Sequence, residues 1–348
     1  MNNSNRPIKS FSEQELVELF SNIKLPKYRV QQVMSWLYEK GAHSYDEMSN
    51  LPKALREQLE ASFPLYSPSV VKKMESSDGS RKYLLEFHDE ARVEAVGIPS
   101  ENGRLTVCVS TQSGCSMGCI FCATGKAGFT RSLYPGEIVD QVLAVQDDFS
   151  ERITNVVLMG QGEPFANYDH VLAALRILNH PKFLAIGARH ITVSTCGVIS
   201  GIKRYSEEPE QFTLAVSLHS AIQETRNRLI PSMEKQRLDT LKVALKRYNE
   251  ITGRRFTFEY ALMKNINDSD EELEALIAYC KGLLCHVNLI PLNKVKDSVV
   301  EPSSASTVHY WNNKLETAGV NSSIRRSKGN DIAAACGQLS AQVKSEER

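Results

Sequence analysis

Short segments rich in β-branched residues alternate with helical patterns from residue 105 onward. Candidate strands lie at 105–110, 153–159, 190–194, 212–218, 255–262 and 286–290. The helical patterns cover 135–148, 168–178, 221–229, 238–251 and 269–284, and a final helix at 304–318 precedes a strand near 321–325. Strands that alternate with helices form parallel βα units, so the sequence predicts an α/β fold. Six repeats favour an open, partial (β/α)6 barrel over a flat sheet, although spacing alone does not decide between them.

The region before residue 105 follows a different pattern. Helical periodicity predicts helices over 13–23 and 28–39, and a third helix begins at Leu51-Pro52 and ends before Pro64. Alternating segments at 82–87 and 92–98, joined by a turn at 88–91, predict a β-hairpin. We therefore divide the chain into a small N-terminal helical domain (1–70), a β-hairpin connector (71–104), the barrel (105–295) and a C-terminal helix, strand and tail (296–348).

Three cysteines follow the first predicted barrel strand at close, unequal spacing: Cys115, Cys119 and Cys122, in the sequence GCSMGCIFC. Their thiolates can bind one metal centre without help from distant segments, and the spacing differs from the C-x2-C pairs of zinc sites. Thiolates are the usual ligands of iron–sulfur clusters, and a cubane normally takes four of them. Three ligands leave one iron open for a substrate or cofactor. The alternative is a structural zinc site completed by Cys108 or a more distant cysteine.

Polar or small residues stand at the ends of four other predicted strands. In chain order these are Gly162 and Glu163, Ser194, Ser217 with Leu218 and His219, and Asn293. Glycine lets a ligand approach the backbone closely, and a carboxylate accepts hydrogen bonds from an ammonium group. Because barrel enzymes keep their chemistry at the carboxyl ends of the strands, we expect these residues and the three cysteines to form one binding site.

The composition limits the partners of this chain. Lys+Arg and Asp+Glu number 41 each, so the formal net charge is zero, and RNA binding requires a local basic patch. The N-terminal helices and Arg325, Arg326 and Lys328 are the candidates. The sequence has no apolar run long enough to span a membrane and no signal-peptide pattern. Eight cysteines without a signal argue against a disulfide framework, so we expect a cytoplasmic protein, and we expect a monomer.

The cysteine spacing, together with Phe121 before the last cysteine, resembles the signature of the radical-SAM superfamily. In that superfamily three cysteines hold a 4Fe–4S cluster whose open iron binds S-adenosylmethionine, and the core is a partial six-unit barrel. Gly162-Glu163-Pro164 resembles the superfamily motif that binds the methionine amino group. The resemblance therefore implies that Cys115, Cys119 and Cys122 are the cluster ligands.

Nearly the whole chain resembles one family within this superfamily, the enzymes that methylate C2 of an adenine in 23S rRNA and, in bacteria, also in tRNA. The similarity covers 92–94, 108–110, the cysteine loop, 162–164, 217–219, 288–291, 329–332 and 335–339. By this resemblance, the S-adenosylmethionine contacts are Gly162, Glu163, Ser194, Ser217, Leu218, His219 and Asn293. The N-terminal helices become the candidate RNA-docking domain.

The resemblance also implies a reaction that uses two S-adenosylmethionine molecules per turnover. Cys336 takes a methyl group from the first, and a radical generated from the second activates that S-methyl group for addition to C2. Cys108 then resolves the protein–RNA crosslink through a transient disulfide with Cys336, and Glu94 is the proton acceptor. An electron donor such as flavodoxin and a thiol reductant are the implied partners.

Two other functions remain open at this level. Related enzymes methylate C8 of the same adenine and confer antibiotic resistance; Pro164 resembles the C2 enzymes, because the C8 relatives tend to carry alanine there. A metal-stapled RNA-binding module without catalysis would explain the three cysteines and the basic patches. It would not explain hydrogen-bonding residues at four strand ends.

Overall fold

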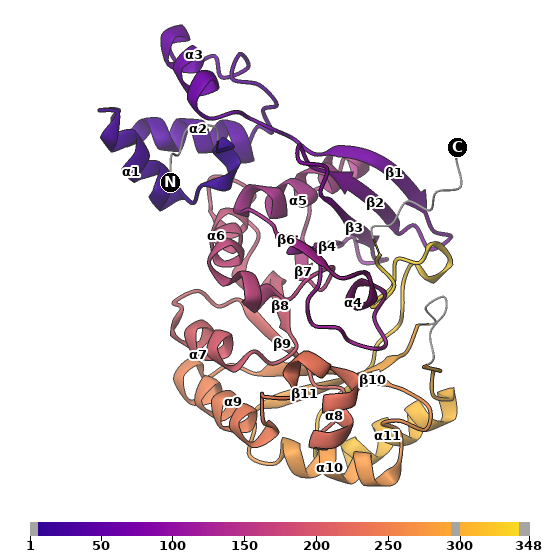
Figure 1. The fold of residues 1–348 in the computed structure, drawn as a ribbon. Coiled ribbons are helices and arrows are strands. Elements are labelled where there is room, and N and C mark those ends of the chain that lie inside the picture. Colours follow the sequence, from indigo (N-terminus) through magenta and orange to yellow (C-terminus); the bar gives the residue numbers. More distant parts are fainter. Residues whose placement is uncertain (1–5, 294–299, 341–348) are drawn as a thin grey trace.

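The computed structural model describes residues 6–293 and 300–340, and the strands of this part form one large sheet and one small one (Figure 1). Across the large sheet the order is β1-β2-β3-β4-β7-β8-β9-β10-β11-β12. The bounds are β1 (Ser69–Glu75), β2 (Arg81–Glu86), β3 (Arg92–Pro99), β4 (Leu105–Cys108), β7 (Asn155–Leu158), β8 (Ile191–Thr195), β9 (Thr213–Ser217), β10 (Phe256–Leu262), β11 (Cys285–Pro291) and β12 (Ser322–Ile324). Strands β4 and β7–β12 pair in parallel, whereas β1–β4 pair antiparallel.

The large helices cover the outer side of the curved sheet, and the N-terminal helices extend from one end of it (Figure 1). Their bounds are α1 (Glu13–Asn22), α2 (Tyr28–Tyr38), α3 (Lys53–Ser62), α5 (Pro135–Phe149), α6 (Tyr168–Asn179), α7 (Ile199–Glu207), α8 (Gln223–Leu229), α9 (Leu238–Thr252), α10 (Asp270–Cys280) and α11 (Ala305–Thr317). Within the described residues β12 does not pair with β4, so the barrel is open. The predicted partial (β/α)6 barrel is therefore confirmed.

The barrel strands are apolar because both faces of a parallel sheet are covered. On β10 the side chains of Phe256, Phe258 and Tyr260 are fully buried, and Tyr260 packs against Trp311 of α11 at 5.2 Å between ring centroids. Glu259 is the charged exception on this strand, and it is also buried. A buried carboxylate on a core strand requires a partner, which marks the inner side of this strand as the place to look for a site.

The N-terminal helices share a continuous hydrophobic core with the barrel. At the junction, Lys9 Nζ lies 2.7 Å from Asp140 Oδ1 of α5, and both side chains are buried. Burial raises the pKa of Asp140, while the Lys9 charge acts in the opposite direction. A Cβ on Gly136 would lie 2.5 Å from the Lys9 carbonyl oxygen, so only glycine permits this close approach.

The described residues contain several elements that the sequence analysis did not predict. Strand β1 precedes the predicted hairpin, and the pairing of β3 with β4 makes the connector continuous with the barrel sheet. A two-stranded sheet of β5 (Gln112–Gly114) and β6 (Phe129–Ser132) flanks the cysteine loop, and α7 lies between β8 and β9. Strand β1 is an almost fully exposed edge strand with two adjacent lysines, so it lacks the apolar alternation on which strand prediction depends.

The predicted boundary at 295–296 lies outside the described residues. Among the helices of the described part, none is both long and apolar enough to cross a lipid bilayer.

Candidate cluster and cofactor site

The three clustered cysteines line a single cavity of about 170 Å³ at the carboxyl ends of the barrel strands. They lie between Gly114, which ends β5, and the short helix α4 (Ala123–Ala127). The loop is held at both ends of the cysteine motif, because Cys115 N donates to Gly128 O at 2.7 Å and Ile120 N donates to Leu229 O at 3.1 Å. The local spacing therefore does bring the three thiols to one wall of one cavity.

The electrostatics of these thiols fit a metal centre. Burial raises the pKa of Cys115 to about 11, with a further rise from the neighbouring Cys122. Burial likewise raises the pKa of Cys119, and both neighbouring cysteines add to the rise. Three thiolates in this space repel one another, whereas a bound metal cluster deprotonates its thiol ligands and compensates their charge. Cys115, Cys119 and Cys122 are thus the residues that would hold the cluster.

Glu163 is fixed at the end of β7, opposite the cysteine loop. Its carboxylate accepts hydrogen bonds from Phe165 N at 3.0 Å and Cys196 N at 2.8 Å. Burial raises the pKa of Glu163, and these backbone donors act in the opposite direction. The preceding Gly162 has φ +100°, and a Cβ there would lie 2.7 Å from the Gln112 side chain. Only glycine therefore places this carboxylate in the cavity wall.

Most of the predicted strand-end residues line the same cavity. They are Gly162, Glu163, Ser194, Ser217, His219 and Asn293. Leu218 is fully buried behind the wall and does not line the cavity. The hydroxyl oxygens of Ser194 and Ser217 lie 3.4 Å apart, so the ends of two adjacent strands offer paired hydroxyl groups to a ligand.

His219 is held neutral in the cavity wall. Its Nδ1 accepts a hydrogen bond from Ala261 N at 3.0 Å, which leaves the proton of the neutral ring on Nε2. Burial and the Arg226 charge lower the pKa of His219 to about 3. The ring packs edge-on against Phe121 of the cysteine loop, at 4.7 Å between centroids. His219 thus packs in the cavity wall as a neutral ring that carries its proton on Nε2.

Cys336 connects this cavity to a second cavity of about 210 Å³. Cys336, Asn293, Arg325, Met159 and Ile290 line both, and Cys108 lines the second. Burial raises the pKa of Cys108 to about 12, and Cys336 contributes to the rise. The two cysteines proposed to react with each other, 228 residues apart in sequence, therefore share one cavity.

The loop that carries Cys336, residues 329–340, is docked on its cysteine-loop side by backbone contacts. Ala123 N donates to Gly337 O at 2.8 Å, and Thr124 Oγ1 donates to Leu339 O at 2.6 Å. The Asn293 amide donates to Cys336 O at 3.3 Å. The strands of the connector hold the other end of this loop.

The β1–β2 turn binds the start of the Cys336 loop. Asp78 Oδ2 accepts from Gly329 N at 2.9 Å. In return, the Asp331 carboxylate accepts from Ser76 Oγ at 2.6 Å and from Ser77 N at 3.0 Å. This reciprocal pair of carboxylate contacts fixes where the chain enters the loop, so the connector acts as a support for Cys336.

Glu94 lies away from both cavities, on the connector beneath the C-terminal segment. It is buried, and its carboxylate forms an ion pair with Lys82 at 3.0 Å and accepts from Ser340 N at 2.6 Å. Lys82 Nζ also donates to Ala333 O at 3.0 Å. In this state the Glu94 carboxylate is bound to the Cys336 loop. The adenine of a substrate could reach this carboxylate only by displacing its contact with Ser340 N.

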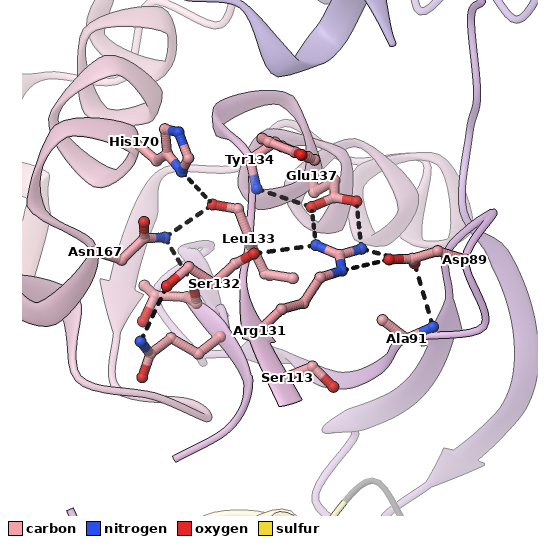
Figure 2. Close-up of polar contacts among 12 residues, drawn as sticks. Asp89, Ala91, Ser113, Arg131, Ser132, Leu133, Tyr134, Glu137, Asn167 and His170 are labelled. Atoms are coloured by element: carbon pink, nitrogen blue, oxygen red, sulfur yellow. Dashed lines mark hydrogen bonds and ion pairs between the residues drawn. The ribbon is translucent and has the colours of Figure 1, made fainter. Parts of the chain in front are cut away.

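An arginine network positions the β5–β6 sheet from which the cysteine loop projects (Figure 2). Arg131 binds Asp89 at 2.5 and 2.8 Å and Glu137 at 2.8 Å through two bonds. His88, Asp89 and Glu137 come close enough together to hold a metal ion. Because both carboxylates are bound to the Arg131 guanidinium, which binds carboxylates bidentately, this cluster is an ion-pair network that anchors the cysteine sheet.

The sequence analysis did not single out two charged groups at the site, Arg226 and Glu259. Arg226 is fully buried behind the cavity wall, and a single arginine in a short helical segment carries no sequence signal for this. Arg325 Nη1 lies 3.6 Å from Glu259 Oε2 and 3.4 Å from Met159 Sδ. Arg325, a candidate RNA contact, is half-buried and lines both cavities, whereas the other two candidates on this segment, Arg326 and Lys328, are exposed.

Comparison with known proteins first defines the class. Residues 109–277 match the model of the radical SAM superfamily, and residues 8–64 match that of the ribosomal RNA large subunit methyltransferase N-terminal domain. A radical SAM methyltransferase from Sphaerobacter thermophilus superposes with a TM-score of 0.90 at 40% identity, covering 97% of this chain and all of the other. The protein is thus an S-adenosylmethionine-dependent transferase of the radical SAM superfamily.

Similar proteins then define the family. A probable dual-specificity RNA methyltransferase RlmN from Lysinibacillus sphaericus is 45% identical over 99% of this chain and 91% of its own length. One from Clostridium novyi is 43% identical over 95% of this chain and 97% of its own length. The chain therefore belongs to the RlmN family of radical SAM RNA methyltransferases. The superfamily implies a 4Fe–4S cluster and S-adenosylmethionine, which agrees with the three thiols and the polar wall described above.

Proposed function

We propose that this protein methylates C2 of a specific adenosine in 23S rRNA, and of an adenosine in tRNA, with Cys336 as the methyl carrier. The observation that carries the proposal is that Cys336 lines both the cavity of the three cluster thiols and the adjoining cavity that contains Cys108. A carrier must meet the methyl donor on one side and the residue that releases the product on the other. The dual-specificity name of the relatives supports rRNA and tRNA as substrates.

In this proposal the residues of the site hold the cluster, bind S-adenosylmethionine or carry the methyl group. Cys115, Cys119 and Cys122 hold the cluster, and Glu163, Ser194 and Ser217 line the wall that would receive S-adenosylmethionine. When bound, the cluster and S-adenosylmethionine supply a methyl group and radical chemistry.

Cys336 supplies the thiolate that forms the new sulfur–carbon bond as the methyl group leaves the donor sulfonium, which becomes a neutral thioether. Two S-adenosylmethionine molecules are consumed per turnover, one as methyl donor and one as radical source.

Cys108 is proposed to release the product. Its thiol is buried and has a raised pKa, so it is protonated at rest. Loss of that proton to solvent or to a neighbouring base lets its sulfur attack Cys336 Sγ. A Cys108–Cys336 disulfide then forms as the bond between Cys336 Sγ and the transferred carbon breaks. The electron pair of that bond passes to the carbon, which takes a proton from solvent and becomes the methyl group, and a two-electron thiol reductant restores both thiols. Glu94 becomes the proton acceptor only after its contact with Ser340 N opens.

Cellular conditions fit this scheme. The thiols that it requires persist in a reducing compartment, and we propose a cytoplasmic monomer that receives electrons from a flavodoxin-like donor.

RNA docking is proposed for the N-terminal helices, because residues 8–64 match the N-terminal domain of ribosomal RNA methyltransferases. A target adenine must leave its stack to enter the cavity.

The test replaces Cys108 by alanine in cluster-loaded protein and searches for RNA covalently attached to Cys336 by mass spectrometry. We expect an adduct in Cys108→Ala, free methylated RNA in the wild type, and neither in Cys336→Ala. Cys280→Ala, at a buried cysteine that lines neither cavity, is the control. A methyl group found on C8 of the adenine would show that C8, and not C2, is the methylated carbon. RNA binding without turnover in iron-loaded protein would favour the RNA-binding module.

A further inference from the structure

Arg226 of α8 is fully buried directly behind the cavity wall. Its guanidinium donates to the carbonyl oxygens of Cys196, Ser217 and Leu218, which lie at the carboxyl ends of β8 and β9. Within the described residues, Arg226 Nε has no hydrogen-bond partner. Arg226 therefore fixes the two strand ends that carry part of the wall, but its hydrogen bonds leave its charge uncompensated.

The groups that act electrostatically on Arg226 are Cys196, Tyr279 and Cys119. All three are neutral when protonated, and across residues 6–293 and 300–340 no carboxylate forms an ion pair with Arg226. Burial lowers the pKa of Arg226. The Glu163 carboxylate lies on the far side of Cys196, where it binds the Cys196 N–H.

An unpaired buried charge is strongly unfavourable, so an anion in the cavity is the expected partner. One of these three neighbours, Cys119, is a predicted cluster ligand and would carry a negative charge once it binds the cluster. The cysteine loop and α8 are joined directly, because Ile120 N donates to Leu229 O at 3.1 Å at the end of the helix. A cluster held by three thiolates is anionic and gains a further negative charge when it is reduced by one electron. The Arg226 guanidinium binds the carbonyl oxygens of Cys196 and Ser217, and both of these residues line the same cavity as the three thiols.

We propose that Arg226 is the fixed counter-charge of the cluster held by Cys115, Cys119 and Cys122, and that it favours the reduced form. Arg226 is a positioning residue, because the hydrogen bonds that it donates within the described part of the chain go to backbone carbonyl oxygens and not to the cysteine sulfur atoms or to a substrate. The electron comes from the external donor, and no covalent bond is made or broken. The inference rests on the proposed function only in requiring that the cluster binds. Fe–S potentials depend on net charge and on nearby hydrogen bonds.

A purely structural role is the alternative explanation, because the guanidinium also satisfies three backbone carbonyl groups. The two explanations differ in their dependence on charge. If Arg226 only supports the strand ends, its replacement destabilises the oxidised and the reduced cluster equally, and the reduction potential does not change. If its charge offsets the negative charge of the cluster, a neutral side chain lowers the reduction potential, whereas lysine preserves it.

The experiment compares Arg226→Gln, Arg226→Met and Arg226→Lys in anaerobically reconstituted full-length protein. Arg228→Gln is the matched control, since Arg228 lies exposed on the same helix. The readouts are the cluster midpoint potential, measured by titration with spectroscopic detection, and the rate of iron loss to a chelator. We expect a lower potential and about tenfold weaker iron retention in the neutral variants, and near wild-type values in Arg226→Lys and Arg228→Gln.

Two outcomes would separate failure of this inference from failure of the proposed function. Equal potentials in Arg226→Lys and in either neutral variant that folds and holds iron would overturn the counter-charge role alone. Wild-type protein that binds no iron under the same conditions would overturn both. If the Gln variant is insoluble, the Met variant, which keeps an apolar stem in the same space, decides the question.

Discussion

Removing the Asp78 carboxylate should release the Cys336 loop without disturbing the barrel. Asp78 Oδ2 accepts the Gly329 backbone N–H at 2.9 Å, and Oδ1 accepts Ser80 N within its own turn at 2.9 Å. A hydrogen bond to a charged group contributes about 1.5–3 kcal/mol, and we take the lower end because the turn is close to solvent. Since 1.4 kcal/mol corresponds to a factor of ten, Asp78→Ala should reduce the equilibrium constant for docking of the loop about tenfold.

The assay uses the Cys108–Cys336 pair as a reporter of loop position. Full-length protein is treated with a mild thiol oxidant, quenched at intervals and digested, and the crosslinked peptide is quantified by mass spectrometry. Disulfide closure should be slower in Asp78→Ala, by up to about tenfold, with unchanged far-UV circular dichroism. Glu101→Ala, at an exposed residue in the turn between β3 and β4, is the control. Equal closure rates in Asp78→Ala and the wild type would show that this contact does not position the loop.

The same contact has a pH dependence with a defined sign. Burial alone would raise the pKa of Asp78, but hydrogen bonds from Gly329 and Ser80 lower it to about 2. A lowered pKa in the folded state means that the stabilisation is present above the unfolded value near 4 and is lost as the pH falls toward 2. Loop docking should therefore be constant from neutral pH down to about 4 and weaken below it, as hydrogen exchange at residues 329–340 would report.

Three further predictions concern other parts of the molecule. Cys336→Ala should bind iron normally but transfer no methyl group to RNA, whereas retained RNA methylation would exclude Cys336 as the carrier. Asp140→Asn leaves Lys9 as an uncompensated buried charge and should cost about 3–5 kcal/mol; denaturant unfolding measures this, and a loss under 1 kcal/mol would contradict it. RNA affinity should fall steeply with salt, because phosphate contacts dominate such binding; a filter-binding series at several salt concentrations checks this, and a flat profile would argue against the basic docking surfaces.

The cysteine loop could be predicted because its information is local. Cys115, Cys119 and Cys122 lie close in sequence, so their spacing alone predicts that the three thiols meet, and they do line one cavity. The strand-end residues could be predicted for a related reason: parallel strands place their carboxyl ends at one rim, so finding the strands also locates Glu163 and Asn293.

Other parts of the site depend on contacts that no short pattern records. Arg226 reads as an ordinary charged helix residue, and only the three-dimensional packing of α8 against two strand ends buries it. The Asp78–Gly329 contact joins residues 251 positions apart. Leu218 was grouped with its neighbours as a ligand contact because it stands in their motif, although the alternation of side chains along a strand turns it away from Ser217 and into the core.

The contacts between the β1–β2 turn and the Cys336 loop join residues that lie far apart in sequence: 251 positions separate Asp78 from Gly329, and 255 separate Ser76 from Asp331. Bringing such distant segments together costs chain entropy before the contacts can repay it. The Cys336 loop should therefore be among the last parts of the protein to dock during folding and among the first to open on partial unfolding.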